Sequence, residues 1–230
     1  MAVPVRNEEA TIEALLDSLL RQTERPDEIV IADGGSTDRT VAIADRYSGQ
    51  GVRVLKLGPA YPGRGRNEAV KAARNEWIAF IDGGCEADPE WLKNLWATRE
   101  ALGSRPGIVF GESKPRIASE WDAAQALAFL GLRDPKTGHG APFIASSLVH
   151  RDVWRAVGGF PEQLRAAEDL VFLQRIEELR VPSVWSPGAV VHWRLAAGPG
   201  AVFRRFRLYS AHHLAAGLFR TWHLRVMVME

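Results

Sequence analysis

Short apolar runs alternate with amphipathic segments through the first part of this chain, and this alternation restricts the possible fold more than any other feature. The runs at residues 28–33, 52–57 and 77–82 are too short for buried helices and suit strands covered on both faces. Helical spacing of apolar residues predicts helices over residues 8–22, 39–47 and 67–74, and one with Trp91, Leu92, Leu95 and Trp96 after Asp88 as N-cap. The pattern predicts an α/β fold with a mostly parallel, Rossmann-type sheet flanked by helices.

The second part of the chain alternates less clearly. Its patterns predict strands over residues 107–111, 143–149, 183–185 and 189–193, helices over residues 119–130 and 166–180, and a Pro/Gly turn over residues 134–140. At the other end, only Ala2–Val5 is available for a first strand, and Pro4 removes one backbone donor from it. Either this strand is stunted or the natural chain has residues before it, and both interpretations stay open.

Composition excludes several classes of protein. The single cysteine, Cys85, excludes a disulfide scaffold, and 46% hydrophobic residues exclude a disordered chain. The net charge of +1 argues against a nucleic-acid partner, because such proteins usually carry a basic excess. No apolar run approaches the roughly 18 residues of a membrane-spanning helix, and the start of the sequence lacks the apolar stretch of a signal peptide. We therefore expect a globular protein that works in the cytoplasm.

Acidic residues stand where predicted strands end. Glu8 follows the first strand, Asp33 ends the second and Asp82 ends the fourth. Ligands of open parallel sheets bind beyond the carboxyl ends of the strands, so we expect these side chains to share a site. The sequence contains neither a G-x-G-x-x-G dinucleotide motif nor a P-loop. Acidic residues at strand ends can instead hydrogen-bond a nucleoside and hold a divalent cation on a diphosphate. The structural alternative is that Asp33 and Asp82 only cap turns.

Several short motifs occur in the order typical of one enzyme family. Residues 4–8 (Pro-Val-Arg-Asn-Glu), 33–38 (Asp-Gly-Gly-Ser-Thr-Asp) and 80–84 (Phe-Ile-Asp-Gly-Gly) resemble the nucleotide-site motifs of family 2 glycosyltransferases, which have the GT-A fold. Residues 157–162, with Gly-Gly-Phe-Pro, and the later Glu-Asp pair at 168–169 resemble two further elements of that family. The resemblance covers about residues 3–193. It implies an inverting nucleotide-diphospho-sugar transferase, typically of cell-envelope polysaccharide or glycolipid synthesis.

The resemblance assigns four residues to the nucleotide. Pro4 and Glu8 lie in the stretch that contacts the nucleoside. Asp33 matches the aspartate that hydrogen-bonds the base, usually uracil, so the implied donor is a UDP-linked sugar. Arg66 matches a basic residue that opens the helix near the nucleotide, which is also a physically sensible place for an anion. The alternative for Arg66 is an arginine on a solvated helix face.

The resemblance also implies a metal site with Mg²⁺ or Mn²⁺. Asp82 matches the first aspartate of the D-x-D motif, which holds the cation on the diphosphate. The sequence departs from this motif at Gly84, where the second aspartate would stand, and this departure puts metal dependence in question. His192, at the end of a predicted strand, resembles the late histidine that completes the metal shell in related enzymes. A structural histidine is the alternative.

The implied catalytic residues are Asp169 and Glu168. By resemblance, Asp169 is the general base that takes the proton of the acceptor hydroxyl, opposite the leaving diphosphate. Glu168 binds the acceptor or raises the pKa of its neighbour by like-charge proximity. The alternative is an acidic pair that favours a helix N-terminus. Gly158 and Gly159 are expected near the donor sugar, and the serines at 146–147 near the acceptor.

Charge is distributed unevenly along the chain. Residues 1–178 carry 22 basic and 27 acidic side chains, whereas residues 179–230 carry seven arginines, one acid and four of the six histidines. Aromatic residues mixed with arginines predict a helical tail over residues 199–230, after a catalytic domain over residues 1–198. This tail suits the inner face of the cytoplasmic membrane or an anionic lipid-phosphate acceptor, or it packs on the domain with its arginines in water. Its histidines are expected on a surface face.

The sequence thus favours transfer of a sugar from a nucleotide diphosphate to a sugar or lipid-linked acceptor, with inversion. A nucleotidyl or phosphosugar transferase on the same sheet is one alternative, and it would need a second metal-binding carboxylate. The other is a degenerate domain that binds nucleotide or membrane without catalysis. Gly84 and the short first strand favour the degenerate domain, while the intact pair of Glu168 and Asp169 favours the enzyme.

Overall fold

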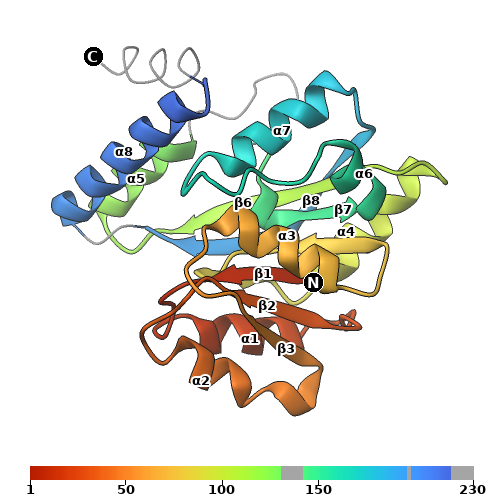
Figure 1. Ribbon diagram of the computed structural model, residues 1–230, viewed down its shortest axis with the longest axis horizontal. Coiled ribbons are helices and arrows are strands. Elements are labelled where there is room, and N and C mark those ends of the chain that lie inside the picture. Colours follow the sequence, from red (N-terminus) through yellow and green to blue (C-terminus); the bar gives the residue numbers. More distant parts are fainter. Residues whose placement is uncertain (131–141, 196–197, 219–230) are drawn as a thin grey trace.

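One eight-stranded sheet runs through the part of the chain that this computed structural model describes, residues 1–130, 142–195 and 198–218 (Figure 1). Its strand order is β3-β2-β1-β4-β7-β6-β8-β5. The strands are β1 (Ala2–Val5), β2 (Ile29–Asp33), β3 (Val52–Lys56), β4 (Trp77–Phe80), β5 (Cys85–Ala87), β6 (Ile108–Arg116), β7 (Ser147–His150) and β8 (Ser183–Arg194). The predicted α/β fold is confirmed.

The first four strands in the order form a parallel block. All four residues of β1 pair with β2, but β1 meets β4 at one position only, Ala2 opposite Phe80. The first strand is therefore as short as the sequence predicts. The two strands diverge beyond this pair, and the loop with Gly83 packs against Val5 in the opening between them.

The other half of the sheet is mixed. Strand β7 is antiparallel to both neighbours, β4 and β6, and β5 is antiparallel to β8 at the edge. Strands β6 and β8 pair in parallel, with a register shift between Phe110 and Glu112. The two short strands predicted at 183–185 and 189–193 are the two ends of β8, interrupted by this irregularity.

Helices cover both faces of the sheet. The described helices are α1 (Ile12–Leu20), α2 (Thr40–Asp45), α3 (Pro62–Ala72), α4 (Trp91–Thr98), α5 (Glu120–Leu130), α6 (Arg151–Ala156), α7 (Glu168–Glu178) and α8 (Gly198–Ala215), with 3-10 turns at Ser48–Gln50, Arg99–Leu102 and Ile144–Ser146. One apolar core lies between the sheet and α1, α2 and α4, and a second lies between the sheet and α3, α6 and α7. Alternation within β2 divides the strand between them, since Ile29 and Ile31 belong to the first core and Val30 and Ala32 to the second.

Two predicted helix starts are wrong. Helix α3 begins at Pro62 rather than residue 67, because proline suits the first helical position and two glycines there allow close packing. Asp88 does not cap α4 with its side chain. Its carbonyl oxygen accepts the N–H of Trp91 at 2.9 Å, while its carboxylate contacts His192.

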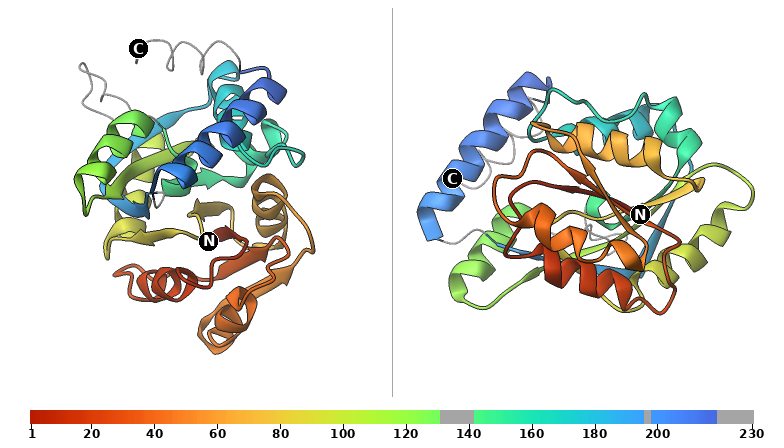
Figure 2. Two further views of the ribbon diagram at one scale, coloured as in Figure 1. Left: turned by 90° about the vertical axis from the view of Figure 1, so that its left-hand side faces the viewer. Right: turned by 60° about the horizontal axis from the view of Figure 1, so that its bottom comes forward.

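Helix α8 lies on the same side of the molecule as α5, away from α6 (Figures 1 and 2). It is the described part of the predicted tail, which extends to residue 230. The rest of that tail and the turn predicted at 134–140 lie outside the described residues. Among the described residues, we find no helix with the length and apolar character needed to cross a membrane.

Candidate active site

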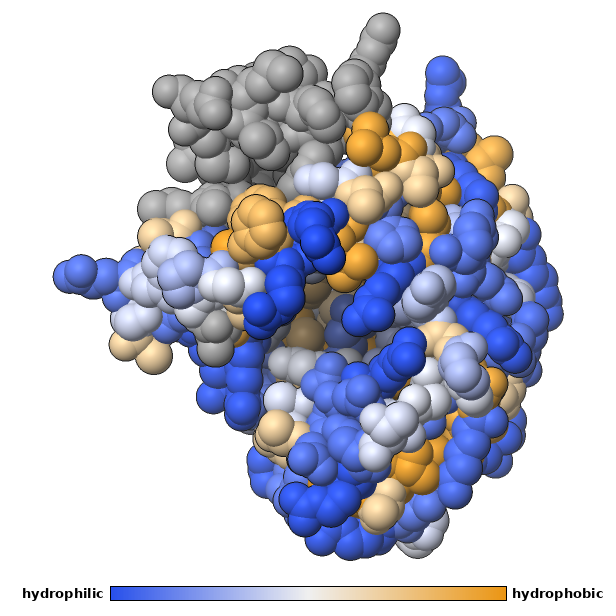
Figure 3. Space-filling model, turned by 60° about the vertical axis from the view of Figure 1, so that its left-hand side comes forward, coloured by the Kyte–Doolittle hydropathy of each residue, from blue (hydrophilic) through white to orange (hydrophobic). Residues whose placement is uncertain are grey.

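A cavity of about 1540 Å³ opens at the carboxyl ends of β1 and β4. The parallel block contributes Pro4, Glu8 and Asp82 to its wall, and the start of α7 contributes Glu168 and Asp169. The surface is hollowed on this side of the molecule, and hydrophilic residues border the opening (Figure 3). Arg66 lines the same cavity, so six of the eight predicted site residues meet around one space, and only Asp33 and His192 do not line it.

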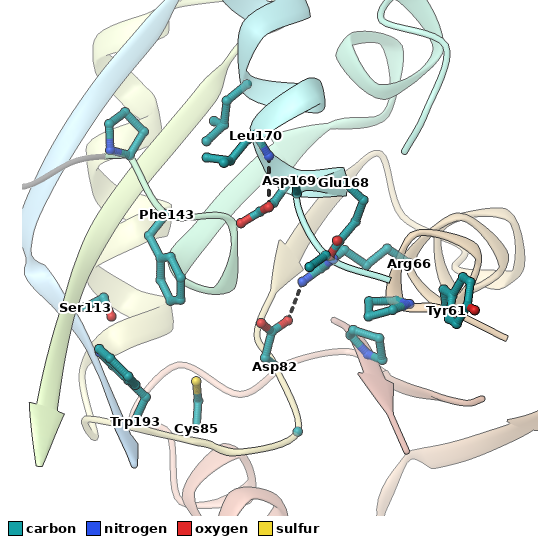
Figure 4. A pocket seen from close by; sticks show the side chains of 18 of the residues that line it. Tyr61, Arg66, Asp82, Cys85, Ser113, Phe143, Glu168, Asp169, Leu170 and Trp193 are labelled. Atoms are coloured by element: carbon teal, nitrogen blue, oxygen red, sulfur yellow. Dashed lines mark hydrogen bonds and ion pairs between the residues drawn. The ribbon is translucent and has the colours of Figure 1, made fainter. Parts of the chain in front are cut away.

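Arg66 joins the two sides of this cavity. Its Nη1 donates to Glu168 Oε1 at 2.6 Å and its Nη2 donates to Asp82 Oδ1 at 2.7 Å (Figure 4). The guanidinium is almost fully buried and lies 5.4 Å from the centre of the Phe160 ring. Burial opposes the charge, but the carboxylates of Asp82, Glu168 and Asp169 outweigh it and hold the pKa of Arg66 above its ordinary value. Arg66 is thus a permanent buried cation and not a solvated surface arginine.

Glu168 and Asp169 occupy the first turn of α7. Burial raises the pKa of Glu168 to about 7, against the opposing charge of Arg66. Burial also raises the pKa of Asp169, again against Arg66, and the charge of Asp82 adds to the rise. Asp169 Oδ1 accepts the N–H of Leu170 at 2.9 Å, and its side chain points into the same space as Asp82 (Figure 4). Such a carboxylate is a stronger base than an ordinary aspartate and can accept a proton.

Glu8 and Asp82 form the acidic side of the cavity. Glu8 Oε2 accepts the hydroxyl of Thr11 at 2.6 Å. Burial raises the pKa of Glu8, and the charges of Asp82 and Asp38 raise it further. A Cβ added at Gly84 would lie 3.8 Å from Glu8 Oε2, so the Glu8 carboxylate stands beside the position of the absent second aspartate.

Asp33 caps its turn. The carboxylate is 4% exposed and accepts the N–H groups of Gly35 and Ser36 at 3.2 Å. Its neighbours Ala32 and Gly34 line the cavity, while Asp33 is not among the lining residues. The structural alternative therefore accounts for Asp33, and its contact with a base stays a prediction.

The structure does not bring His192 to Asp82. His192 Nε2 lies 2.8 Å from Asp88 Oδ1. Its neighbour Trp193 lines the cavity and pairs with Cys85, so strand alternation directs His192 to the other face of β8. Among the described residues, no three His, Cys, Asp or Glu side chains are grouped so that they could hold a metal. The expectation that His192 completes a metal shell with Asp82 does not fit this geometry.

The predicted roles of four small residues are also wrong. Ser146 and Ser147 are fully buried, and the Ser146 hydroxyl bonds Ala189 O and Trp91 Nε1. A Cβ at Gly159 would lie 2.8 Å from the side-chain oxygen of Asn67, so this glycine permits packing against α3. Its neighbour Gly158 has a positive φ of 77°, which a turn into that packing requires. None of the four lines the cavity.

Sequence reasoning missed the contribution of α8. Arg205, Tyr209 and His213 line the cavity, and they recur at every fourth position on one helix face. His213 is 6% exposed, with Nδ1 2.7 Å from Tyr209 O, and His212 Nδ1 accepts the N–H of Arg165 at 3.3 Å. The prediction of a histidine surface face is therefore wrong for His213, while the third histidine of that predicted face, His223, lies outside the described residues. The four-residue spacing could have indicated a common face, although not its partner.

Comparison with known proteins decides the family. A profile described as Glycosyl transferase family 2 matches residues 1–139. The chain belongs to this family. Uncharacterized glycosyltransferase EpsJ of Bacillus subtilis is 41% identical over 184 residues, which cover 74% of this chain and 53% of EpsJ. Poly(ribitol-phosphate) beta-N-acetylglucosaminyltransferase TarS of Staphylococcus aureus is 29% identical over 184 residues, covering 75% of this chain and 31% of TarS. The chain thus spans about half or less of the length of these relatives.

Two solved structures share the fold of this family 2 glycosyltransferase domain. S. aureus TarS 1–349 in complex with UDP-GlcNAc superposes with a TM-score of 0.67 at 22% identity, covering 87% of this chain and 59% of that one. The mannosyltransferase PcManGT from Pyrobaculum calidifontis, in complex with GDP-Man and Mn²⁺, gives a TM-score of 0.70 at 20% identity, covering 94% and 63%. The predicted GT-A-like architecture is confirmed.

Proposed function

We propose that this domain transfers a sugar from a nucleotide diphosphate donor, a UDP sugar, to an acceptor hydroxyl with inversion. One observation carries the proposal: Asp82 and Asp169 face one cavity from different elements, and Arg66 connects their two sides. The complexes of TarS with UDP-GlcNAc and of PcManGT with GDP-Man support a nucleotide-sugar donor. The first of these favours uridine.

Asp169 is the general base of this reaction. The acceptor oxygen attacks the anomeric carbon from the face opposite the diphosphate, and Asp169 takes the hydroxyl proton. The bond between the anomeric carbon and the diphosphate oxygen breaks, and the diphosphate leaves with the electron pair. The raised pKa of Asp169 supports this role, because a stronger base near the working pH transfers protons more efficiently.

Arg66 acts on the carboxylates as well as on the nucleotide. It lines the cavity, where a guanidinium favours the charge of a diphosphate. Both of its terminal nitrogens bond carboxylates, so Arg66 also fixes the positions of Asp82 and Glu168. Pro4 and Glu8 line the same side and remain our candidates for the nucleoside contact, with Asp33 behind them.

A divalent cation, Mg²⁺ or Mn²⁺, fits the acidic side of the cavity. Asp82 and Glu8 present hard oxygen atoms, and the charge of Asp82 adds to the rise in the pKa of Glu8 that burial causes. Magnesium is commonly bound by one or two carboxylates together with substrate phosphates, so a cage of protein groups alone is not required. Asp82 and Glu8 would hold the cation, which would neutralise the charge of the departing diphosphate. The Mn²⁺ complex of PcManGT supports this part of the proposal.

The tail beyond residue 198 is proposed to meet a membrane surface. The outer face of α8 exposes Phe203 (69%) and Leu214 (52%) beside the exposed Arg204 and Arg207, a mixture that suits anionic lipid. We retain residues 1–198 as the catalytic domain, at the inner face of the cytoplasmic membrane, with a sugar or lipid-linked acceptor. Flotation with anionic vesicles should weaken when Phe203 and Leu214 are both changed to Ser. Equal flotation of both proteins would contradict membrane docking by α8.

Donor hydrolysis tests the reaction. A panel of nucleotide sugars should be assayed with Mg²⁺ or Mn²⁺ for the native protein, for Asp169→Asn and for the matched control Asp152→Asn, whose carboxylate is exposed on α6. We expect turnover of a UDP sugar, a loss of about 10²-fold or more in Asp169→Asn and no change in the control. Binding of UDP without turnover of any donor would favour a degenerate nucleotide-binding domain. Release of a sugar 1-phosphate, the product left when UMP is transferred, instead of UDP would favour a nucleotidyl transferase.

A further inference from the structure

The inner face of α8 brings positive charge to the side of the cavity that holds Asp169. Arg205 and Tyr209 of α8 line the cavity, and so does Arg165 from the segment that leads into α7. The N–H of Arg165 donates to His212 Nδ1 at 3.3 Å, which ties this segment to α8. Two arginines from elements far apart in the sequence therefore line the same cavity.

This part of the cavity lies close to the proposed base. Burial raises the pKa of Tyr209, the positive charge of Arg205 lowers it, and the carboxylates of Asp169, Glu168 and Asp82 raise it. Tyr209 thus lies within electrostatic range of the whole carboxylate group. The donor proposed above is bound by residues from other elements of the cavity wall, Glu8, Asp82 and the glycines of the 82–84 loop. The α8 side remains for the second substrate.

We propose that α8 and Arg165 form the acceptor subsite, and that the acceptor carries a phosphate group near its reacting hydroxyl. The proposal rests on the glycosyl transfer proposed above. Arginine is the side chain whose planar fork matches phosphate oxygens in two parallel hydrogen bonds. A phosphate held by Arg205 and Arg165 offsets the repulsion that an anionic acceptor meets from Glu168 and Asp169. It also fixes the hydroxyl beside the base.

Equilibrium binding of two matched probes tests the subsite without requiring turnover. Ribitol 5-phosphate and ribitol should be titrated into the full chain with saturating UDP, which fills the donor side. We expect the phosphate probe to bind about tenfold or more tightly than ribitol, as a charge-assisted hydrogen-bond pair allows. Equal binding of both probes would overturn the proposal.

Variants on the two faces of α8 locate the effect. Arg205→Gln on the inner face and Arg165→Gln on the exposed segment should each weaken binding of ribitol 5-phosphate about tenfold and leave UDP binding unchanged. Arg204→Gln, exposed on the outer face of the same helix, is the matched control. Circular dichroism establishes that α8 is retained. Equal effects of Arg204→Gln and Arg205→Gln, or no effect of Arg205→Gln and Arg165→Gln, would overturn the assignment.

A second arm identifies the source of the phosphate. Arg205→Gln and Arg165→Gln are compared with the native protein for flotation with neutral vesicles that contain a polyprenyl phosphate. Weaker binding of ribitol 5-phosphate together with weaker flotation assigns the phosphate to a lipid-linked acceptor, and weaker binding with unchanged flotation assigns it to a soluble acceptor. Unchanged binding of ribitol 5-phosphate overturns the subsite whatever the flotation result. The test is separate from the reaction itself, because Asp169→Asn should lose turnover while it keeps the preference for the phosphate probe.

Discussion

Arg66 and Glu168 are 102 residues apart in the sequence, yet Arg66 Nη1 and Glu168 Oε1 lie 2.6 Å apart in the protein interior. The two side chains are only 4% and 6% exposed. Because Arg66 belongs to α3 and Glu168 to α7, the ion pair ties together two helices on the same face of the sheet. The same guanidinium holds Asp82, so the arrangement of the acidic groups depends on this single cation.

Replacing Arg66 should strongly destabilise the protein. Arg66→Met leaves Glu168 buried with its charge uncompensated, and breaking a buried pair in this way typically costs about 3–5 kcal/mol. Glu168 can escape by binding a proton, so the loss should be smaller below its pKa of about 7 than above it. Urea unfolding at pH values on both sides of the pKa measures both effects. Arg64→Met, on the exposed side of the same helix, should change stability by less than about 0.5 kcal/mol, and an equal loss in both variants would contradict this account.

The Glu168–Asp169 pair should control the acid limb of the pH–rate profile. Asp169 must be ionised to act as a base, and the charge of Asp169 and that of Glu168 oppose each other's ionisation. Glu168→Gln removes one of these charges, so the apparent pKa of the acid limb of kcat/KM should fall by about one unit. Glu162→Gln, an exposed change in the loop before α7, serves as the control. An unchanged acid limb in Glu168→Gln would show that the pair does not titrate together.

The same pair predicts the pH dependence of stability. The folded-state pKa of Glu168, about 7, lies above the ordinary value of 4.5, so the folded state binds this proton more tightly than the unfolded state. Protonation of Glu168 should therefore increase the free energy of unfolding as the pH falls from above 7 towards 4.5. Glu168→Gln should flatten that part of the stability profile. If the variant keeps the native slope of unfolding free energy against pH, another titrating group causes that slope.

Residue patterns predicted much of the fold and part of the site. Apolar runs ending in acid predicted β2 and β4, and the carboxyl ends of such strands meet at one edge, which is why Asp82 and Glu8 lie together. His192 could not be placed in this way. The direction of its side chain depends on the pairing of β8 with β5. Residue spacing along the sequence predicts neither this register nor the contact with Asp88.

The role of α8 was hidden for a similar reason. The spacing of Arg205, Tyr209 and His213 indicates a shared face, but only tertiary packing decides that this face meets the cavity. The early start of α3 was missed because Gly63 and Gly65 add no apolar side chain to the helical pattern. The structure shows that they are needed for contact with neighbouring backbone.

Gly63 tests the packing of α3 against the segment before α7. A Cβ at this position would overlap the carbonyl oxygen of Pro161, and backbone cannot move away as a flexible side chain can. Gly63→Ala should therefore cost about 1–3 kcal/mol, despite the better helix propensity of alanine. Gly49→Ala is the matched control, since nothing lies within 4 Å of the added carbon. Thermal or urea unfolding measures both, and a stable Gly63→Ala protein would mean that the Pro161 segment yields easily.

Gly84→Asp tests the cation site directly. The added Cβ has room, because Glu8 Oε2 at 3.8 Å is the only atom of the described residues within 4 Å of it apart from its chain neighbours. The new carboxylate would, however, join those of Glu8 and Asp82. Without a cation the three negative charges repel, so the variant should have a lower Tm than the native protein in EDTA. With UDP present, a third hard oxygen ligand should lower the Kd for Mn²⁺ about tenfold, and added Mn²⁺ should raise the Tm of the variant more than that of the native protein. Gly84→Asn, which has the same shape without the charge, separates the electrostatic effect from a change in loop structure. If Gly84→Asp and Gly84→Asn bind Mn²⁺ equally well, Glu8 and Asp82 do not hold the cation on the diphosphate.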